Sequence, residues 1–184
     1  ALGERFDFQI FADECYSEIY RGTAPVGALD VAQEMGASAE RVVAFHSLSK
    51  RSNLPGLRSG FCAGGRRVMR ALSDLRAIAG PQSPLAVQEA AALAWSDDAH
   101  AQENRQKYSK KFAAAEALFA GRYDFYRPAG GFFLWLNVGD GEAAARHLWV
   151  TQGVRVLPGA YLARDGAGGD NPASAYIRIA LVDE

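Results

Sequence analysis

Cysteine, net charge and long apolar runs are all scarce in this sequence of 184 residues. Its two cysteines, Cys15 and Cys62, are too few for a disulfide framework and lack zinc-like spacing, so a reducing, cytoplasmic setting is the default. The 20 Lys and Arg residues against 21 Asp and Glu leave a formal net charge of −1, which gives no electrostatic reason to bind nucleic acid or an anionic membrane. No apolar run reaches the roughly 18 to 20 residues that span a bilayer. Glu4 and Asp7 interrupt any signal-peptide core.

Enough apolar sequence is present for a real core, since hydrophobic residues make up 49% of the chain. Runs rich in β-favouring residues predict strands at 6–11, 42–45, 60–63, 123–126, 132–138, 154–157 and 176–182. Helical spacing and stop signals predict helices at 28–36, 68–80, 84–95, 96–121 and 142–152. Ser83 is expected to cap a helix whose first residue is Pro84.

This order of elements predicts an α/β layer, a long connecting helix and a small α+β domain. We expect the first domain to cover residues 1–100 and the second, with the long helix, residues 101–184. In an open parallel sheet, ligands bind at the carboxyl ends of the strands. Asp13 follows the first predicted strand and the segment 47–50 follows the second, so we expect both at one edge of the sheet.

The segment Ser47-Leu48-Ser49-Lys50, with Arg58 eight residues further on, is the strongest chemical signal. Burial of Lys50 beside arginines favours a neutral amine, which can form a Schiff base with a carbonyl. The two hydroxyls and the guanidinium of Arg58 can hold a phosphate. A lysine, a phosphate cradle and an acid at a strand end are what pyridoxal phosphate requires. The alternative is a solvated basic loop.

Two further residues fit the same chemistry. Asp13 can accept a hydrogen bond from a protonated ring nitrogen, and Tyr16, three residues later, can donate its phenol to a ring oxygen. The alternative is a surface acid beside a core tyrosine.

Arg178 interrupts an apolar strand, and its planar guanidinium fits the carboxylate of an amino acid. A structural ion pair or an exposed strand face would explain Arg178 equally well. The histidines and cysteines show no spacing that indicates a metal site.

The segments 11–20 and 47–60, together with Gly130-Gly131-Phe132-Phe133-Leu134-Trp135 and Arg178-Ile179-Ala180, closely resemble class I/II pyridoxal-phosphate aminotransferases of fold type I. The resemblance implies the C-terminal part of the large domain, with a mostly parallel sheet, followed by the small α+β domain. It also implies that the complete enzyme is a homodimer that acts on small amino and keto acids.

The resemblance implies a role for each matching residue. Lys50 would form the Schiff base and shuttle a proton at the substrate α-carbon. Asp13 would pair with the ring nitrogen, and Tyr16 would contact the ring oxygen. The phosphate would be held by Ser47, Ser49 and Arg58. Arg178 would bind the substrate α-carboxylate.

A narrower resemblance rests on segments 156–164, 171–172 and 176–182 and on Lys50-Arg51-Ser52-Asn53. These segments look like the N-succinyldiaminopimelate aminotransferases of lysine biosynthesis, which exchange an amino group between glutamate and N-succinyl-2-amino-6-ketopimelate. Because loops vary with specificity, this resemblance concerns the substrate and not the reaction type.

The family's first half has no counterpart in this sequence. That half carries a glycine-rich turn, an aromatic residue that stacks on the cofactor and an Asn that contacts its ring. Since the chain also begins at Ala1 without Met, we expect a truncated piece of an enzyme with weak activity by itself and an exposed apolar edge at its first strand. Three other functions remain open: another class I/II aminotransferase, a lyase or decarboxylase on the same scaffold, and a non-catalytic regulatory domain.

Overall fold

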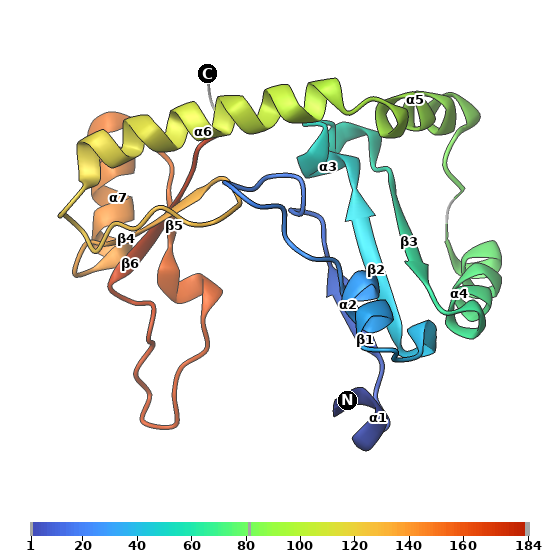
Figure 1. Ribbon diagram of the computed structural model, residues 1–184. Coiled ribbons are helices and arrows are strands. Elements are labelled where there is room, and N and C mark those ends of the chain that lie inside the picture. The colour runs from blue at the N-terminus through green and yellow to red at the C-terminus, as the bar shows by residue number, and fades with distance from the viewer. Residues whose placement is uncertain (1, 81, 183–184) are drawn as a thin grey trace. The chain divides into compact units, whose positions relative to one another are not determined.

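The computed structural model describes residues 2–80 and 82–182 (Figure 1). The chain forms two compact units, residues 1–106 and 107–184. The division falls inside the long helix α6 (Ala99–Phe119), a few residues after its start. The boundary predicted from the sequence lies between residues 100 and 101.

The first unit is built on a sheet of three strands, in the order β1-β2-β3. They are β1 (Ile10–Asp13), β2 (Val42–Ser47) and β3 (Gly60–Gly64). β1 and β2 are parallel, whereas β2 and β3 are antiparallel. Val43 in the central strand is fully buried, as expected for an apolar run with neighbours on both sides. The first strand begins later than predicted, because residues 2–5 form the short helix α1 (Leu2–Arg5).

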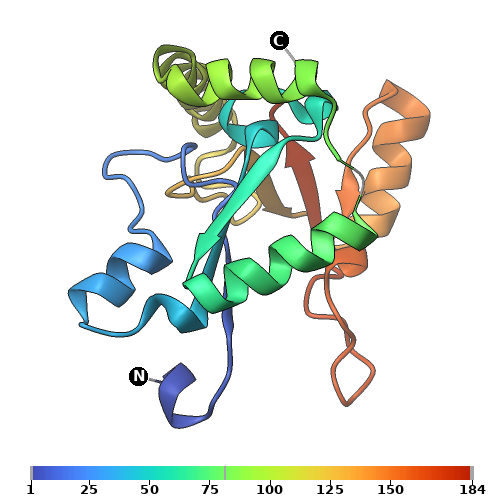
Figure 2. The same ribbon diagram turned by 90° about the vertical axis from the view of Figure 1, so that its right-hand side faces the viewer.

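Short helices and turns connect these strands. They are α2 (Ala28–Glu34), η1 (Ala39–Arg41), α3 (Leu48–Arg51) and η2 (Pro55–Leu57). The longer helix α4 (Arg66–Ala79) follows β3 and lies against it (Figure 2). Its first turn is capped by the Glu40 carboxylate, whose oxygens accept hydrogen bonds of 2.9 and 3.0 Å from the N–H groups of Arg66 and Arg67. A Cβ at Gly65 would lie 2.3 Å from the Glu40 Cα, so this approach requires glycine.

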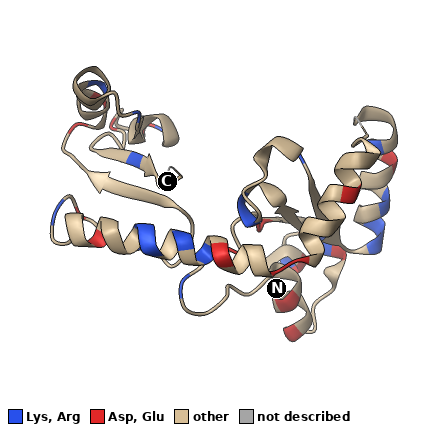
Figure 3. Ribbon diagram, turned by 90° about the horizontal axis from the view of Figure 1, so that it is seen from above, with Lys and Arg blue, Asp and Glu red and all other residues tan. Residues whose placement is uncertain are grey.

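Two helix boundaries differ from the prediction. α5 (Leu85–Ser96) begins one residue after Pro84, which is extended and occupies the cap position itself, so the prediction that Ser83 caps this helix was wrong. α6 begins at Ala99 rather than at residue 96, because Asp97 is extended and its carboxylate accepts a hydrogen bond of 2.8 Å from the Ala99 N–H. Figure 3 shows residues of both charges along α6. Among the described residues, no helix is long and apolar enough to cross a membrane.

The second unit holds an antiparallel sheet of three strands in the order β4-β6-β5. Its elements are β4 (Phe133–Asn137), α7 (Gly141–Gln152), β5 (Leu157–Pro158), η3 (Gly159–Leu162) and β6 (Tyr176–Ala180). α7 lies alongside β5 and β6 (Figures 1 and 2). The core of this unit gathers residues from α6, β4 and β6, namely Phe112, Ala115, Leu134, Leu136 and Ile177.

Two predicted strands in this unit require correction. Residues 123–126 do not form a strand: Tyr123 and Asp124 lie in a turn, with φ angles of 57° and 52°, and residues 125–126 are irregular. Val154 is not in a strand either, because its N–H donates to the Leu148 carbonyl at the end of α7, 3.2 Å away. That bond closes the helix behind Gly153, whose φ is 66°.

Candidate active site

Lys50 lies on a one-turn helix at the carboxyl end of the central strand. Ser47, the last residue of β2, caps this helix, because its Oγ accepts a hydrogen bond of 3.1 Å from the Ser49 N–H. The two hydroxyls lie 2.9 Å apart. Leu48 points into the core and is fully buried. Lys50 itself is half-buried.

The chain returns to this place through the turn η2. The Leu48 N–H donates to the Ser59 carbonyl at 3.2 Å, which fixes residues 58–59 beside the cap of α3. Arg58 has a left-handed backbone, with φ 51° and ψ 39°, and its exposed guanidinium donates to the Pro55 carbonyl at 3.1 Å. The structure therefore brings together the segments that carry Ser47, Ser49 and Arg58.

Asp13 and Tyr16 reach the same edge from β1. Asp13 is the last residue of β1 and lies opposite Phe45 in the parallel register, two residues before Ser47 ends β2. Tyr16 is 37% exposed, and the Lys50 Nζ lies 5.8 Å from its ring centroid. The predicted convergence at this edge of the sheet is confirmed.

The electrostatic setting keeps Asp13 ionised. Hydrogen bonds from the Cys15 side chain and from the Cys15 backbone N–H hold the pKa of the Asp13 carboxyl below its ordinary value. The N–H···Oδ1 distance is 3.1 Å. Burial, followed by the contact with Asp13, raises the pKa of the Cys15 thiol to about 11. The exposed Asp13 carboxylate is thus suited to receive a proton-bearing ring nitrogen, whereas Cys15 is a neutral neighbour.

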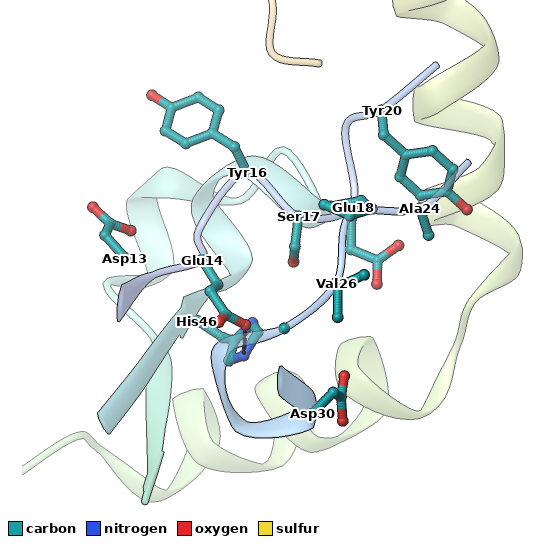
Figure 4. A pocket seen from close by; sticks show the side chains of 12 residues that line it. Asp13, Glu14, Tyr16, Ser17, Glu18, Tyr20, Ala24, Val26, Asp30 and His46 are labelled. Carbon is teal, nitrogen blue, oxygen red and sulfur yellow. Dashed lines mark ion pairs between the residues drawn. The ribbon is translucent and has the colours of Figure 1, made fainter. Parts of the chain in front are cut away.

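A pocket of about 480 Å³ opens beside these residues (Figure 4). Glu14 lines this pocket. One of its carboxylate oxygens accepts a hydrogen bond from the Ala28 N–H at 2.7 Å, and the other lies 3.3 Å from the His46 Nε2. His46 stacks on Phe61 with a centroid distance of 4.9 Å. Glu14 thereby ties the end of β1 to α2, a role that sequence reasoning missed although the residue adjoins Asp13.

Arg178 lies in the second unit, at the centre of β6. It is half-buried, pairs across the sheet with Trp135, and its Cζ lies 4.4 Å from the Phe133 ring centroid. Within residues 2–80 and 82–182, Arg178 forms no ion pair with a carboxylate. A structural ion pair therefore does not account for this arginine in the part of the chain that the structure describes.

Sequence reasoning also missed the surroundings of the residues that follow Lys50. Arg51 and Ser52 are buried, with 6% and 7% of their surface exposed, and both contact the junction of α5 and α6. The His100 Nε2 lies 2.8 Å from the Ser52 Oγ. The available signal was the Asp97-x-x-His100 spacing at a helix start.

These features match one protein family across nearly the whole chain. The model of the family described as aminotransferase class I and II matches residues 2–183. The chain belongs to this family. Class I and II aminotransferases depend in general on pyridoxal phosphate, so the convergence of Lys50 with Asp13 and Tyr16 lies in a fold that supports such chemistry.

Curated relatives include aminotransferases of different substrates. The chain is 36% identical over 170 residues to 4-dedimethylamino-4-oxo-anhydrotetracycline transaminase OxyQ of Streptomyces rimosus, a match covering 92% of this chain and 45% of that protein. It is 29% identical over 184 residues to LL-diaminopimelate aminotransferase of Aquifex aeolicus, covering 97% and 45%. The chain thus spans less than half the length of these relatives.

Solved aminotransferase structures confirm the predicted α/β fold class. An aminotransferase of Neisseria meningitidis superposes with a TM-score of 0.91 at 42% identity, over all of this chain and 47% of the other. Aminotransferase AspB of Helicobacter pylori gives 0.88 at 38% identity, again over 47% of its length.

Proposed function

We propose that the whole protein is a pyridoxal-phosphate-dependent aminotransferase in which Lys50 holds the cofactor covalently. The observation that carries this proposal is the meeting of two parallel strand ends: Lys50 follows β2, Asp13 ends β1, and the Lys50 Nζ lies 5.8 Å from the Tyr16 ring. An amine, a carboxylate and a phenol at one sheet edge supply the groups that this cofactor requires.

The residues present fit the cofactor in kind and in place. Ser47 and Ser49 offer two hydroxyls 2.9 Å apart, and the backbone at Arg58 lies beside them, which suits a phosphate. Asp13 remains ionised because hydrogen bonds from Cys15 lower its pKa, which suits a protonated ring nitrogen. Tyr16 is exposed and its phenol can reach a ring oxygen.

Each of these residues has a distinct task in transamination. The bound cofactor supplies an electron sink for the electrons released at the substrate α-carbon. Lys50 moves the proton between the two carbon atoms that exchange it, since an amine on a short, anchored turn can act as base and then as acid. The carboxylate of Asp13 preserves positive charge on the nitrogen it contacts. Ser47, Ser49 and Arg58 keep the phosphate end fixed while the proton moves.

Arg178 is proposed to bind the α-carboxylate of the amino or keto acid. Its planar fork matches a carboxylate, and no acid of the described residues occupies it. The guanidinium carbon lies over the Phe133 ring, 4.4 Å from its centroid, which is a cation–π contact.

The proposed exchange is between glutamate and N-succinyl-2-amino-6-ketopimelate, by a cytoplasmic homodimer. The resemblance of segments 156–164 and 171–172 supports this substrate, and the structure joins the two segments: the Asn171 amide donates to the Ala160 carbonyl at 3.1 Å and to Asp165 at 3.0 Å. LL-diaminopimelate aminotransferases are among the relatives. LL-diaminopimelate and the proposed succinylated keto acid share the same seven-carbon diacid skeleton.

A substrate panel tests this function. The purified whole protein with pyridoxal phosphate is supplied with glutamate and, in turn, the succinylated keto acid, tetrahydrodipicolinate, oxaloacetate or no acceptor, and 2-oxoglutarate is measured. We expect the highest kcat/KM with the succinylated keto acid. A preference for another acceptor contradicts the substrate assignment alone. Glutamate consumption is followed as well: many turnovers without any acceptor and without 2-oxoglutarate indicate a lyase or decarboxylase and contradict transamination, which forms at most one 2-oxoglutarate per site under that condition.

A further inference from the structure

We propose that Arg51 and a hydrogen-bonded chain of Ser52, His100 and Asp97 position the lysine turn for catalysis. We call these four residues, together with Asp98, the α3 brace. The inference rests on the proposed function, because it assigns positioning residues to the Lys50 amine. All five residues belong to the first unit.

The turn that carries Lys50 cannot hold its own shape. α3 has four residues, and a helix of that length is unstable without packing. Leu48 anchors its beginning in the core. The end is anchored by Arg51 and Ser52, the polar residues that are buried within the described parts of the chain. Because a buried guanidinium is costly without partners, its contacts determine where the turn ends.

Arg51 contacts the junction of α5 and α6 on several sides. Its Nη1 donates to the Ala94 carbonyl at 2.7 Å and its Nη2 to the Asp97 carbonyl at 3.1 Å. The Nη2 also forms an ion pair with the Asp98 carboxylate. Its Cζ lies 5.2 Å from the Trp95 ring centroid. Carbonyls at the end of a helix have no partner within it, so Arg51 caps α5 while it fixes α3.

Ser52 adds a second connection between α3 and the start of α6, through His100. The Asp97 carboxylate accepts from the Ala99 N–H and contacts the His100 Nδ1 at 2.7 Å. The bond to His100, followed by that to Ala99, lowers the pKa of Asp97, so this carboxylate is an acceptor and His100 carries its proton on Nδ1. The His100 Nε2, on the other side of the ring, lies 2.8 Å from the Ser52 Oγ. The Ser52 Oγ in turn lies 3.5 Å from the Arg51 Nη1.

The two connections act directly after Lys50 in the chain. A shift of α3 would displace the Lys50 Cα relative to Asp13 at the end of β1 and to Tyr16 in the turn that follows β1. A misplacement of about 1 Å costs on the order of 100-fold in rate when a reacting group must meet a fixed partner. The brace therefore controls the proton transfer at Lys50 rather than substrate affinity.

Two variants and a matched control test this in the whole holoenzyme. Arg51→Met removes the fork, and Ser52→Ala, a smaller change, breaks the chain to His100. The control is Arg127→Met, because Arg127 binds the Ser109 carbonyl and hydroxyl at 3.1 Å and Glu116 at 3.2 Å in the second unit. We measure kcat and KM separately, the melting temperature, and the absorbance of the Lys50-bound cofactor as a function of pH.

We expect a kcat loss of about 100-fold for Arg51→Met and about 10-fold for Ser52→Ala, with KM within about threefold and a displaced pH midpoint of the absorbance. Arg127→Met should lower the melting temperature with wild-type kcat and spectrum. Wild-type spectra and kcat in folded Ser52→Ala, or in folded Arg51→Met, would overturn the brace while leaving the proposed function intact. Absence of a Lys50-bound cofactor in the wild type would overturn both.

Discussion

At the scale of single residues, the site depends on a few local charges in a chain that is close to neutral. Asp13 and Cys15 show how this works. The carboxylate is stabilised by hydrogen bonds from Cys15, while burial and the nearby carboxylate disfavour a thiolate. The same short segment therefore provides an acid that stays ionised and a thiol that stays protonated.

The raised pKa of Cys15 makes its alkylation dependent on high pH. Because the pKa is raised to about 11, the reactive thiolate appears only as the pH rises toward that value. We expect iodoacetamide labelling of Cys15 in a Cys62→Ser background to keep increasing between pH 9 and pH 11, as followed by mass spectrometry. A rate that is already constant above pH 9 would contradict the environment described for this thiol.

Replacement of Arg178 tests the proposed carboxylate contact. Arg178→Lys keeps the positive charge but cannot form two parallel hydrogen bonds to a carboxylate. We therefore expect KM for amino and keto acids to rise about tenfold, with a smaller change in kcat. Arg146→Lys, an exposed arginine in α7 of the same unit, is the control and should leave KM unchanged. Equal effects of the two substitutions would remove Arg178 from the substrate site.

At the scale of elements, side chains from neighbouring segments decide where helices begin. Asp140 caps α7, since its carboxylate accepts from the Ala143 N–H at 3.0 Å. Glu40 caps α4 from a different segment of the chain. Such caps satisfy N–H groups that a helix cannot satisfy itself.

Glu40→Ala should destabilise the first unit by about 1 kcal/mol, because two N–H groups of α4 lose their acceptor. Urea denaturation measures this as a lower midpoint with an unchanged slope. Glu34→Ala, an exposed residue at the end of α2, is the control and should remain within about 0.5 kcal/mol of the wild type. If both substitutions lower the free energy of unfolding by the same amount, the Glu40 cap does not contribute to stability.

The elements show which features were predictable from sequence. β2, β3, α4 and α7 follow from apolar periodicity and from glycine stops, which are local signals. The turn at Tyr123 was mistaken for a strand because its aromatic residues favour β structure, whereas the left-handed backbone depends on contacts with Asn137. The burial of Arg51 was equally hidden, since the partners of its guanidinium other than Ser52 lie 43 or more residues further along the chain.

At the scale of the whole molecule, the edge strand β1 and the segment that precedes it carry apolar residues on their surface. The predicted apolar edge is confirmed for the described residues: Phe6, Phe8, Ile10 and Phe11 are between 39% and 65% exposed. Exposed apolar strand edges favour association with other chains.

The 184-residue chain by itself should therefore bind the dye ANS strongly and transaminate weakly. Phe11→Lys should reduce dye fluorescence, whereas Tyr161→Lys, at an equally exposed position of 65%, should change it little. Equal fluorescence of all three chains would show that the β1 edge is not the exposed patch. Full turnover by the isolated chain would contradict the expectation of weak activity.

The central claim is that Lys50 holds the cofactor. The most direct measurement is borohydride reduction of the whole protein with pyridoxal phosphate, followed by peptide mapping, with Lys50→Ala as control. We predict one pyridoxyl group, on the peptide containing Lys50, and none at that peptide in the variant. A label on any other lysine, or no stable label in the wild type, would contradict the assignment.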